Sequence, residues 1–184
     1  GKTALLQRAR SVQHQPEEKM YAVYVEIRNK QEADLLKVLQ KELRRVGLDI
    51  GNCETFDDLC DNLYSSFSKG KISRLQIFVD ESDAFFEESA QQEYENLTPV
   101  INLMRDTKKK IKFVFAGLHN VAHTSSAIEK NGLLMQFGNS LCISPLSPTD
   151  SRKLIERPLS YLGFKIGPRQ LALILANTNS YPGL

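Results

Sequence analysis

The first three residues of the chain, Gly1-Lys2-Thr3, are of the types that bind a phosphate chain, and a helix-forming run follows them. A glycine lets backbone amides approach phosphate oxygens, and the N-terminus of a helix favours negative charge. A lysine at this place reaches the outer phosphates, and a threonine hydroxyl ligates Mg²⁺. The tripeptide matches the end of the loop Gly-x-x-x-x-Gly-Lys-Ser/Thr. Because three residues also match by chance, the interpretation needs a second element.

The second element is a pair of adjacent carboxylates, Asp80-Glu81, directly after the apolar run at residues 75–79. Open α/β sheets bind their ligands outside the carboxyl ends of the strands, which is where such a pair would lie. We expect Asp80 to hold Mg²⁺ through water, and Glu81 to polarise the water that attacks a terminal phosphate. An isolated Asp-Glu pair most often only begins a turn. Together with the Gly-Lys-Thr helix opening, this pair predicts a nucleotide site.

A nucleotide site of this kind needs a parallel sheet, and short apolar runs alternate along the chain with segments of helical periodicity. The runs that predict strands cover residues 20–27, 75–79, 111–116 and 141–143. Predicted helices cover residues 4–13, 31–46, 93–106 and 126–137, and a further helix carries Phe56, Leu59, Leu63 and Phe67 on one face. Strands separated by helices are joined by right-handed crossovers. The sequence therefore predicts an α/β fold with a parallel sheet covered on both faces.

The pattern changes after Ser144, because no further strand is predicted. Residues 147–150 carry a capping serine, a proline suited to the first helical position and an acid three residues after the serine. A second helix opens at Gly167-Pro168. We therefore expect a core at residues 1–145 and a small helical subdomain, continuing beyond the last residue, at residues 146–184.

Composition limits the classes of partner. Lysine and arginine number 24 against 22 acidic residues, a formal charge of +2, so nucleic acid is an unsupported alternative partner. The three cysteines are odd in number and lack Cys-x-x-Cys spacing, which is typical of reduced thiols in the cytosol. No run approaches the ~18 consecutive apolar residues that a membrane span needs. We expect a cytoplasmic protein without a membrane partner.

Four segments taken together resemble the successive landmarks of the AAA+ and STAND ATPases, which are P-loop NTPases of the archaeal-ATPase-like kind. They are Gly1-Lys2-Thr3, the strand ending in Asp80-Glu81-Ser82-Asp83, residues 113–120 (FVFAGLHN) and residues 141–146 (LCISPL). The resemblance covers nearly the whole chain. It implies a three-layer P-loop core, with the first strand and most of the Walker A loop upstream of Gly1, followed by a helical lid. It also implies that ATP or ADP and Mg²⁺ are the cofactors.

The resemblance assigns further nucleotide contacts outside the two Walker elements. Asn120 or His119 would sense the terminal phosphate after the fourth core strand, and a loop residue without a ligand is an equal alternative. STAND lids contact the base or ribose through a Gly-x-Pro turn. Residues 180–182 (SYP) hold the similar place but lack the glycine, which leaves Pro182 as the candidate contact.

The arginine finger of a standard AAA+ ring is missing, because residues 127–138 contain no arginine. Arg105 would act in trans in a STAND-like assembly, or it is a helix C-terminal charge favoured by the dipole. In AAA+ proteins a polar residue at the position of Arg28-Asn29 holds the catalytic glutamate inactive. A solvated strand end is the alternative for this pair.

These observations predict an ATP-binding and ATP-hydrolysing switch in a larger protein, with self-association or effector domains of the same polypeptide as its partners. Two alternatives remain. One is a signalling module that holds nucleotide without turnover. The other is a fragment of a DEAD-type helicase, because Asp-Glu-Ser-Asp at residues 80–83 imitates that motif. A helicase needs a Ser-Ala-Thr-like segment after the next strand, and residues 115–119 (FAGLH) do not provide one.

Overall fold

The computed structural model describes residues 1–27, 32–83, 85–86, 97–117 and 145–180. The chain divides into a larger compact unit, Lys2–Asn139, and a smaller one, Ser140–Leu184, which also takes Gly1. None of the helices in the described ranges has the length and apolar character needed to cross a membrane. The predicted boundary between residues 145 and 146 stays a prediction.

The larger unit is built on a parallel sheet in the order β1-β2-β3. The strands are β1 (Met20–Glu26), β2 (Arg74–Asp80) and β3 (Ile111–Phe115). In the register, Glu26 lies beside Asp80, and Val79 lies beside Phe115. The carboxyl ends of the three strands therefore meet at one edge of the sheet. The predicted α/β class and the parallel pairing are confirmed for these strands, whereas the predicted helix at 126–137 and strand at 141–143 lie outside the described residues.

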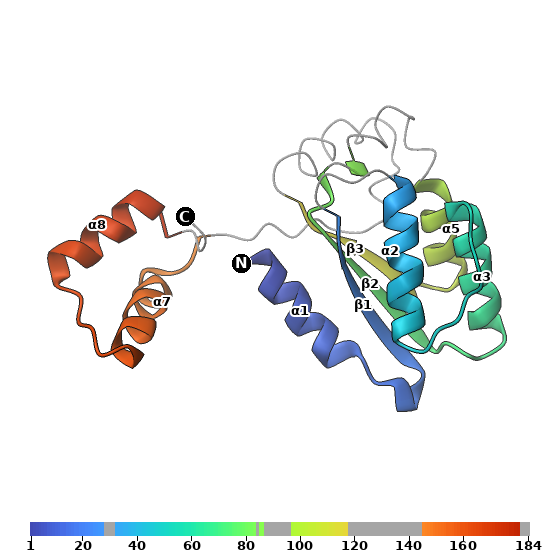
Figure 1. The fold of residues 1–184 in the computed structure, drawn as a ribbon, viewed down its shortest axis with the longest axis horizontal. Helices are drawn as coiled ribbons and strands as arrows, with labels where there is room; N and C mark the ends of the chain where they lie inside the picture. Colours follow the sequence, from blue (N-terminus) through green and yellow to red (C-terminus); the bar gives the residue numbers. More distant parts are fainter. Residues whose placement is uncertain (28–31, 84, 87–96, 118–144, 181–184) are drawn as a thin grey trace. The chain divides into compact units, whose positions relative to one another are not determined.

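Helices cover both faces of this sheet, as Figure 1 shows. On one face, α1 (Lys2–Gln13) packs Leu6 against Ala22 and Phe78. On the other face lie α2 (Glu32–Arg45), α3 (Phe56–Ser68) and α5 (Thr98–Asp106). Alternate residues of β1 and β2, such as Val23 and Ile77, join the larger core beneath these three helices. The three-layer arrangement follows from the strand period of two residues, because apolar side chains occupy both faces of each strand.

Local sequence signals fix the helix ends. The hydroxyl of Thr55 accepts a hydrogen bond from the Asp58 amide (3.1 Å), and the Asp58 carboxylate accepts one from the Thr55 amide (2.9 Å), which forms a capping box before α3. Helix α2 ends before Gly47, which takes a positive φ of 85°. The short 3-10 helix η1 (Pro16–Glu18) leads from α1 into β1. Helix α1 is followed by β1, whereas α2 is followed by α3 and then β2.

The smaller unit contains α7 (Pro148–Tyr161) and α8 (Pro168–Thr178). The hydroxyl of Ser147 accepts a hydrogen bond from the Asp150 amide (3.1 Å), so the predicted helix start is confirmed. The predicted opening of the second helix at Gly167-Pro168 is also confirmed, with Gly167 as its N-cap residue. Both helices form where the prolines and caps place them.

Candidate functional site

The candidate site lies at the carboxyl edge of the sheet, where β2 ends in Asp80. Phe78 packs on the face covered by α1, and Asp80, two residues later, has the same strand parity. The Asp80 side chain therefore extends toward the face where α1 begins. Asp80 is 1% exposed, and a buried carboxylate needs hydrogen-bond donors to offset the loss of water.

Thr3, in the first turn of α1, provides one of these donors. Its Oγ1 donates a hydrogen bond to Oδ2 of Asp80 at 2.7 Å, although the two residues are 77 positions apart in the sequence. The amide of Glu81 donates to the other oxygen, Oδ1, at 3.0 Å. The Gly-Lys-Thr helix opening and the Asp-Glu pair are thus brought together within hydrogen-bond distance.

Tyr24 on β1 is a third donor to this carboxylate, and the sequence-based interpretation missed it. Its hydroxyl donates to Oδ2 of Asp80 at 2.9 Å. Burial raises the pKa of the Tyr24 hydroxyl well above its ordinary value, and the hydrogen bond to Asp80 adds to the increase. The hydroxyl therefore stays protonated and donates. The available signal was strand parity, because Tyr24 shares the α1 face with Ala22 and lies two residues before the strand end.

Lys2 lies at the same edge but is bonded to a different strand end. Its half-buried side chain donates from Nζ to the carbonyl oxygen of Gly117 at 2.7 Å, and Gly117 follows β3. The amine is therefore held near the ends of the strands by a neutral acceptor. A charged phosphate oxygen is a stronger acceptor for an ammonium group than a carbonyl is, so this contact is exchangeable.

Glu81 begins a turn with strained backbone. Its φ is 54°, and this left-handed conformation costs a non-glycine residue roughly 1–2 kcal/mol. The next residue anchors the turn, because the amide and the hydroxyl of Ser82 both donate to the Ala116 carbonyl, each at 2.9 Å. Among the residues that the structure describes, none bonds to the Glu81 carboxylate, which is half-buried.

The side-chain oxygen atoms of Thr3 and Asp80 at this edge are of the type that ligates a magnesium ion. A hydroxyl and a carboxylate are hard oxygen ligands, and Mg²⁺ is commonly held by one or two protein groups together with phosphates and water. The described ranges contain no cluster of three or more histidine, cysteine, aspartate or glutamate side chains of the kind that holds a metal by protein ligands alone. The Thr3 hydroxyl and the Asp80 carboxylate are oxygen ligands of the type that Mg²⁺ prefers.

Several predicted site residues stay untested. His119, Asn120 and Pro182 lie outside the described residues, as does the pair Arg28-Asn29. Gly1 is exposed and has open space around it. These assignments remain predictions.

Two predicted features away from the site have local explanations. Arg105, in the last turn of α5, is exposed and pairs with Asp106 through Nε and Oδ1 at 3.2 Å. This pairing matches the interpretation of Arg105 as a helix-end charge, although a role in trans is not tested by it. Cys53 and Cys60 are buried free thiols, and burial raises the pKa of Cys60 to about 12. The Cys60 thiol is therefore a packing group and not a nucleophile.

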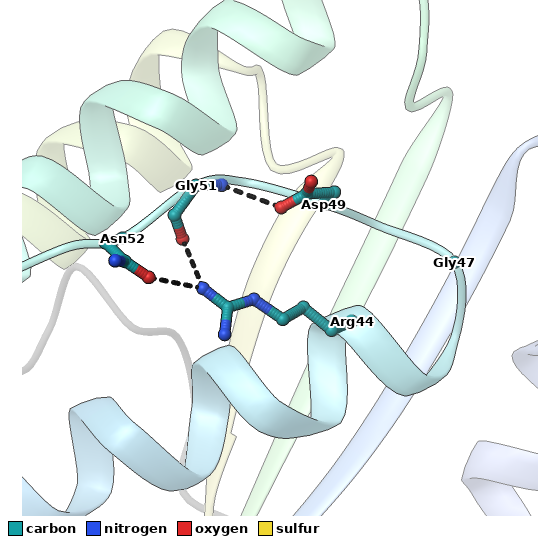
Figure 2. Close-up of a pocket in the computed structure, with 5 residues that line it drawn as sticks. All are labelled: Arg44, Gly47, Asp49, Gly51 and Asn52. Carbon is teal, nitrogen blue, oxygen red and sulfur yellow. Dashed lines mark hydrogen bonds between the residues drawn. The ribbon is translucent and has the colours of Figure 1, made fainter.

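The opposite end of the larger unit carries an open surface hollow of about 540 Å³, lined by Arg44, Gly47, Asp49, Gly51 and Asn52. Figure 2 shows that the Arg44 guanidinium points into it and is already bonded. One nitrogen, Nη2, donates to the Gly51 carbonyl at 3.1 Å and to Oδ1 of Asn52 at 2.6 Å. Because α2 starts beyond the end of β1 and runs back along the sheet, its last turn lies far from Asp80. The hollow is a local turn and contains none of the predicted site residues.

A scan against protein-family models and a search of curated proteins found no match to this chain. A functional assignment therefore depends on the geometry at the carboxyl edge of the sheet.

Proposed function

We propose that this chain is the ATP-binding and ATP-hydrolysing switch domain of a larger AAA+/STAND-type protein, built on a P-loop core. The observation that carries the proposal is the 2.7 Å hydrogen bond from Thr3 to Asp80. It joins the start of a helix to the end of a parallel strand at the edge where open α/β sheets bind ligands. In P-loop enzymes the same two groups hold the magnesium ion that accompanies the nucleotide.

Lys2 has the position and charge to bind the phosphate chain. Its amine is held 2.7 Å from the Gly117 carbonyl, at the ends of the strands. On nucleotide binding, Lys2 exchanges this carbonyl for the outer phosphate oxygens, and the amides at the start of α1 contribute the positive end of the helix dipole. Bound Mg²⁺ would neutralise part of the phosphate charge, with Thr3 as a direct ligand and Asp80 holding the ion through water.

Glu81 is the candidate general base. Its carboxylate accepts a proton from the attacking water, whose oxygen forms a bond to the terminal phosphorus while the bond from that phosphorus to the bridging oxygen breaks. The products are ADP and inorganic phosphate. The left-handed turn at Glu81 and the hydrogen bond of Ser82 set the backbone position from which the Glu81 side chain extends.

The helical subdomain that contains α7 and α8 acts as a lid over the nucleotide, with Pro182 as its contact to the base or ribose. His119 or Asn120 senses the terminal phosphate. Nucleotide state then passes to effector domains of the same polypeptide or to a second copy, in the cytoplasm.

The substitution Glu81→Gln tests catalysis, with phosphate release and nucleotide binding measured for the variant and for wild type. Loss of the general base should slow phosphate release by roughly 100-fold or more while nucleotide binding is retained. Glu17→Gln, on an exposed residue of η1, is the matched control and should change neither quantity.

Other outcomes select the alternatives. A wild-type protein that binds ATP without releasing phosphate is a nucleotide-binding module without turnover. A protein that binds neither ATP nor ADP, with or without Mg²⁺, contradicts the proposal altogether.

A further inference from the structure

The Asp80 carboxylate is held by groups from three segments of the chain. Thr3 from α1 and Tyr24 from β1 both donate to Oδ2, at 2.7 and 2.9 Å, and the Glu81 amide donates to Oδ1 at 3.0 Å. The proposed function already uses Thr3 as a magnesium ligand and Glu81 as a base. Tyr24 is the one of these donors that has no role in it.

Tyr24 is well placed to fix the orientation of Asp80. It pairs with Phe78 in the sheet register, so its backbone position is set by the ladder between β1 and β2. Its ring packs against the small cluster that contains Leu6, Ala22 and Phe78. A tyrosine has two side-chain torsions, and both are restricted when the ring is packed. The hydroxyl therefore reaches Oδ2 from a rigid support.

Thr3 alone gives weaker control of the same oxygen. Thr3 is exposed and lies in the first turn of α1, where helix ends fray. When its hydroxyl oxygen ligates a metal, only its proton remains for Asp80. A second donor on β1, whose backbone is set by the sheet register, holds the same oxygen from another segment of the chain.

We propose that Tyr24 is a positioning residue for the magnesium site: its hydroxyl holds the Asp80 carboxylate in the orientation that binds Mg²⁺. This role rests on the proposed function, because the metal accompanies the nucleotide. Outer groups that orient a metal-binding carboxylate commonly change metal affinity by about 10- to 100-fold when they are removed. Tyr24 does not touch the substrate, so its effect passes through Asp80.

The test is Tyr24→Phe, which removes only the hydroxyl. Tyr21→Phe is the matched control, because Tyr21 lies on the same strand and packs against the larger core on the other face. The measurement is ADP affinity as a function of free Mg²⁺, with a parallel titration in EDTA. In Tyr24→Phe the Mg²⁺ concentration that gives half the gain in affinity should rise about tenfold. ADP affinity in EDTA should stay at the wild-type value, and Tyr21→Phe should match wild type in both titrations.

A double-substitution cycle separates positioning from packing. If Tyr24 acts through Asp80, then Tyr24→Phe should have no further effect on the Mg²⁺ titration of Asp80→Asn. A purely structural role would lower the melting temperature of Tyr24→Phe and leave its Mg²⁺ midpoint equal to that of wild type.

The outcomes distinguish this role from the proposed function. A wild-type protein whose ADP affinity depends on Mg²⁺, with Tyr24→Phe giving the same midpoint, overturns the role of Tyr24 alone. A wild-type protein that binds no ADP overturns the proposed function and the role of Tyr24 together. A raised midpoint that persists in the Asp80→Asn background overturns the part of the inference that routes the effect through Asp80.

Discussion

The carboxyl edge of the sheet and the hollow at the opposite end of the larger unit both carry clusters of polar groups. The hydrogen bonds in the two clusters join residues at very different separations in the sequence. At the carboxyl edge the bonds Thr3–Asp80, Tyr24–Asp80 and Lys2–Gly117 join residues 77, 56 and 115 positions apart. At the opposite end, the bonds of the hollow in Figure 2 span 7, 8 and 2 positions. Hydrogen bonds between residues close in the sequence satisfy the polar groups of a turn wherever the chain makes one. Long-range bonds exist only because the whole sheet has assembled, and a site that needs groups from several strands is built that way.

Backbone strain alone does not separate the two ends. Gly51 takes a positive φ of 75° in the hollow, and Lys19, Lys108 and Lys109 take positive φ in exposed turns elsewhere. The turn at Lys19 is also tied to a distant segment, because its carbonyl accepts hydrogen bonds from the amide and the hydroxyl of Ser73. Glu81 differs from Lys19 because it directly follows Asp80 at the carboxyl edge of the sheet. Positive φ therefore supports a candidate site at Glu81 only together with its place beside Asp80.

The largest expected difference between the two ends is in nucleotide binding. Lys2→Ala removes the ammonium group proposed to bind the phosphates and should weaken ATP affinity by about 3 kcal/mol, or more than 100-fold. Arg44→Ala removes an equal charge from the hollow and should leave the affinity unchanged. Binding of a fluorescent ATP analogue measures both. Equal losses in the two variants would mean that the affinity depends on overall charge and not on the carboxyl edge.

Opposite effects on stability are expected when the residue types are exchanged at the two positive-φ positions, Glu81 and Gly51. Glu81→Gly relieves the left-handed strain and should stabilise the fold by about 1 kcal/mol, although phosphate release is lost. Gly51→Ala adds a Cβ in open space at positive φ and should destabilise it by about 1 kcal/mol.

Urea unfolding of both variants and of wild type gives the two differences. A stabilised Glu81→Gly would mean that this turn is kept for function at a cost in stability. If Glu81→Gly is less stable than wild type, the turn at Glu81 is held by contacts that outweigh its strain.

The sequence was sufficient to predict most of the described elements and part of the candidate site. Apolar runs located β1, β2 and β3, and helical periodicity located α2 and α3, because burial on one or two faces leaves a period that sequence alone preserves. Lys2, Thr3, Asp80 and Glu81 are predicted site residues because their types match a motif with a known chemistry, and the structure brings Thr3 to Asp80.

The rest of the site depended on register, which the sequence does not display. Tyr24 within an apolar strand resembles any buried aromatic residue until β1 is aligned beside β2. The acceptors for Lys2 and Ser82 are backbone carbonyls, at Gly117 and Ala116, and a backbone carbonyl has no signature in the residue type. Contacts of these kinds become visible only when the strand ends are placed side by side.

The core between the two ends offers a control, because the pH dependence of its stability involves neither polar cluster. Cys60 on α3 has its pKa raised to about 12 by burial, from an ordinary value of 9.0. The folded-state pKa is higher than the unfolded-state pKa. The contribution of the protonated Cys60 thiol to the free energy of unfolding is therefore fully present below pH 9 and is lost as pH rises toward 12. Wild type should lose ~1.4 kcal/mol more than Cys60→Ala between pH 8 and pH 10. Identical pH slopes for the two proteins would show that the thiol ionises without penalty in the fold.

The smallest expected effect compares one hydroxyl at the carboxyl edge with one amide at the hollow. Ser82 is 0% exposed, and its Oγ donates to the Ala116 carbonyl at 2.9 Å, so Ser82→Ala should cost about 1 kcal/mol of folding stability. The carbonyl keeps the Ser82 amide as a donor, which limits the loss. Asn52→Ala removes an exposed, local contact to Arg44 and should change stability by less than about 0.5 kcal/mol. Urea midpoints at constant m-value measure both, and a larger loss for Asn52→Ala would reverse the ranking of the two ends. Since the Ser82 bond also fixes the turn at Glu81, Ser82→Ala should slow phosphate release as well, whereas Asn52→Ala should not.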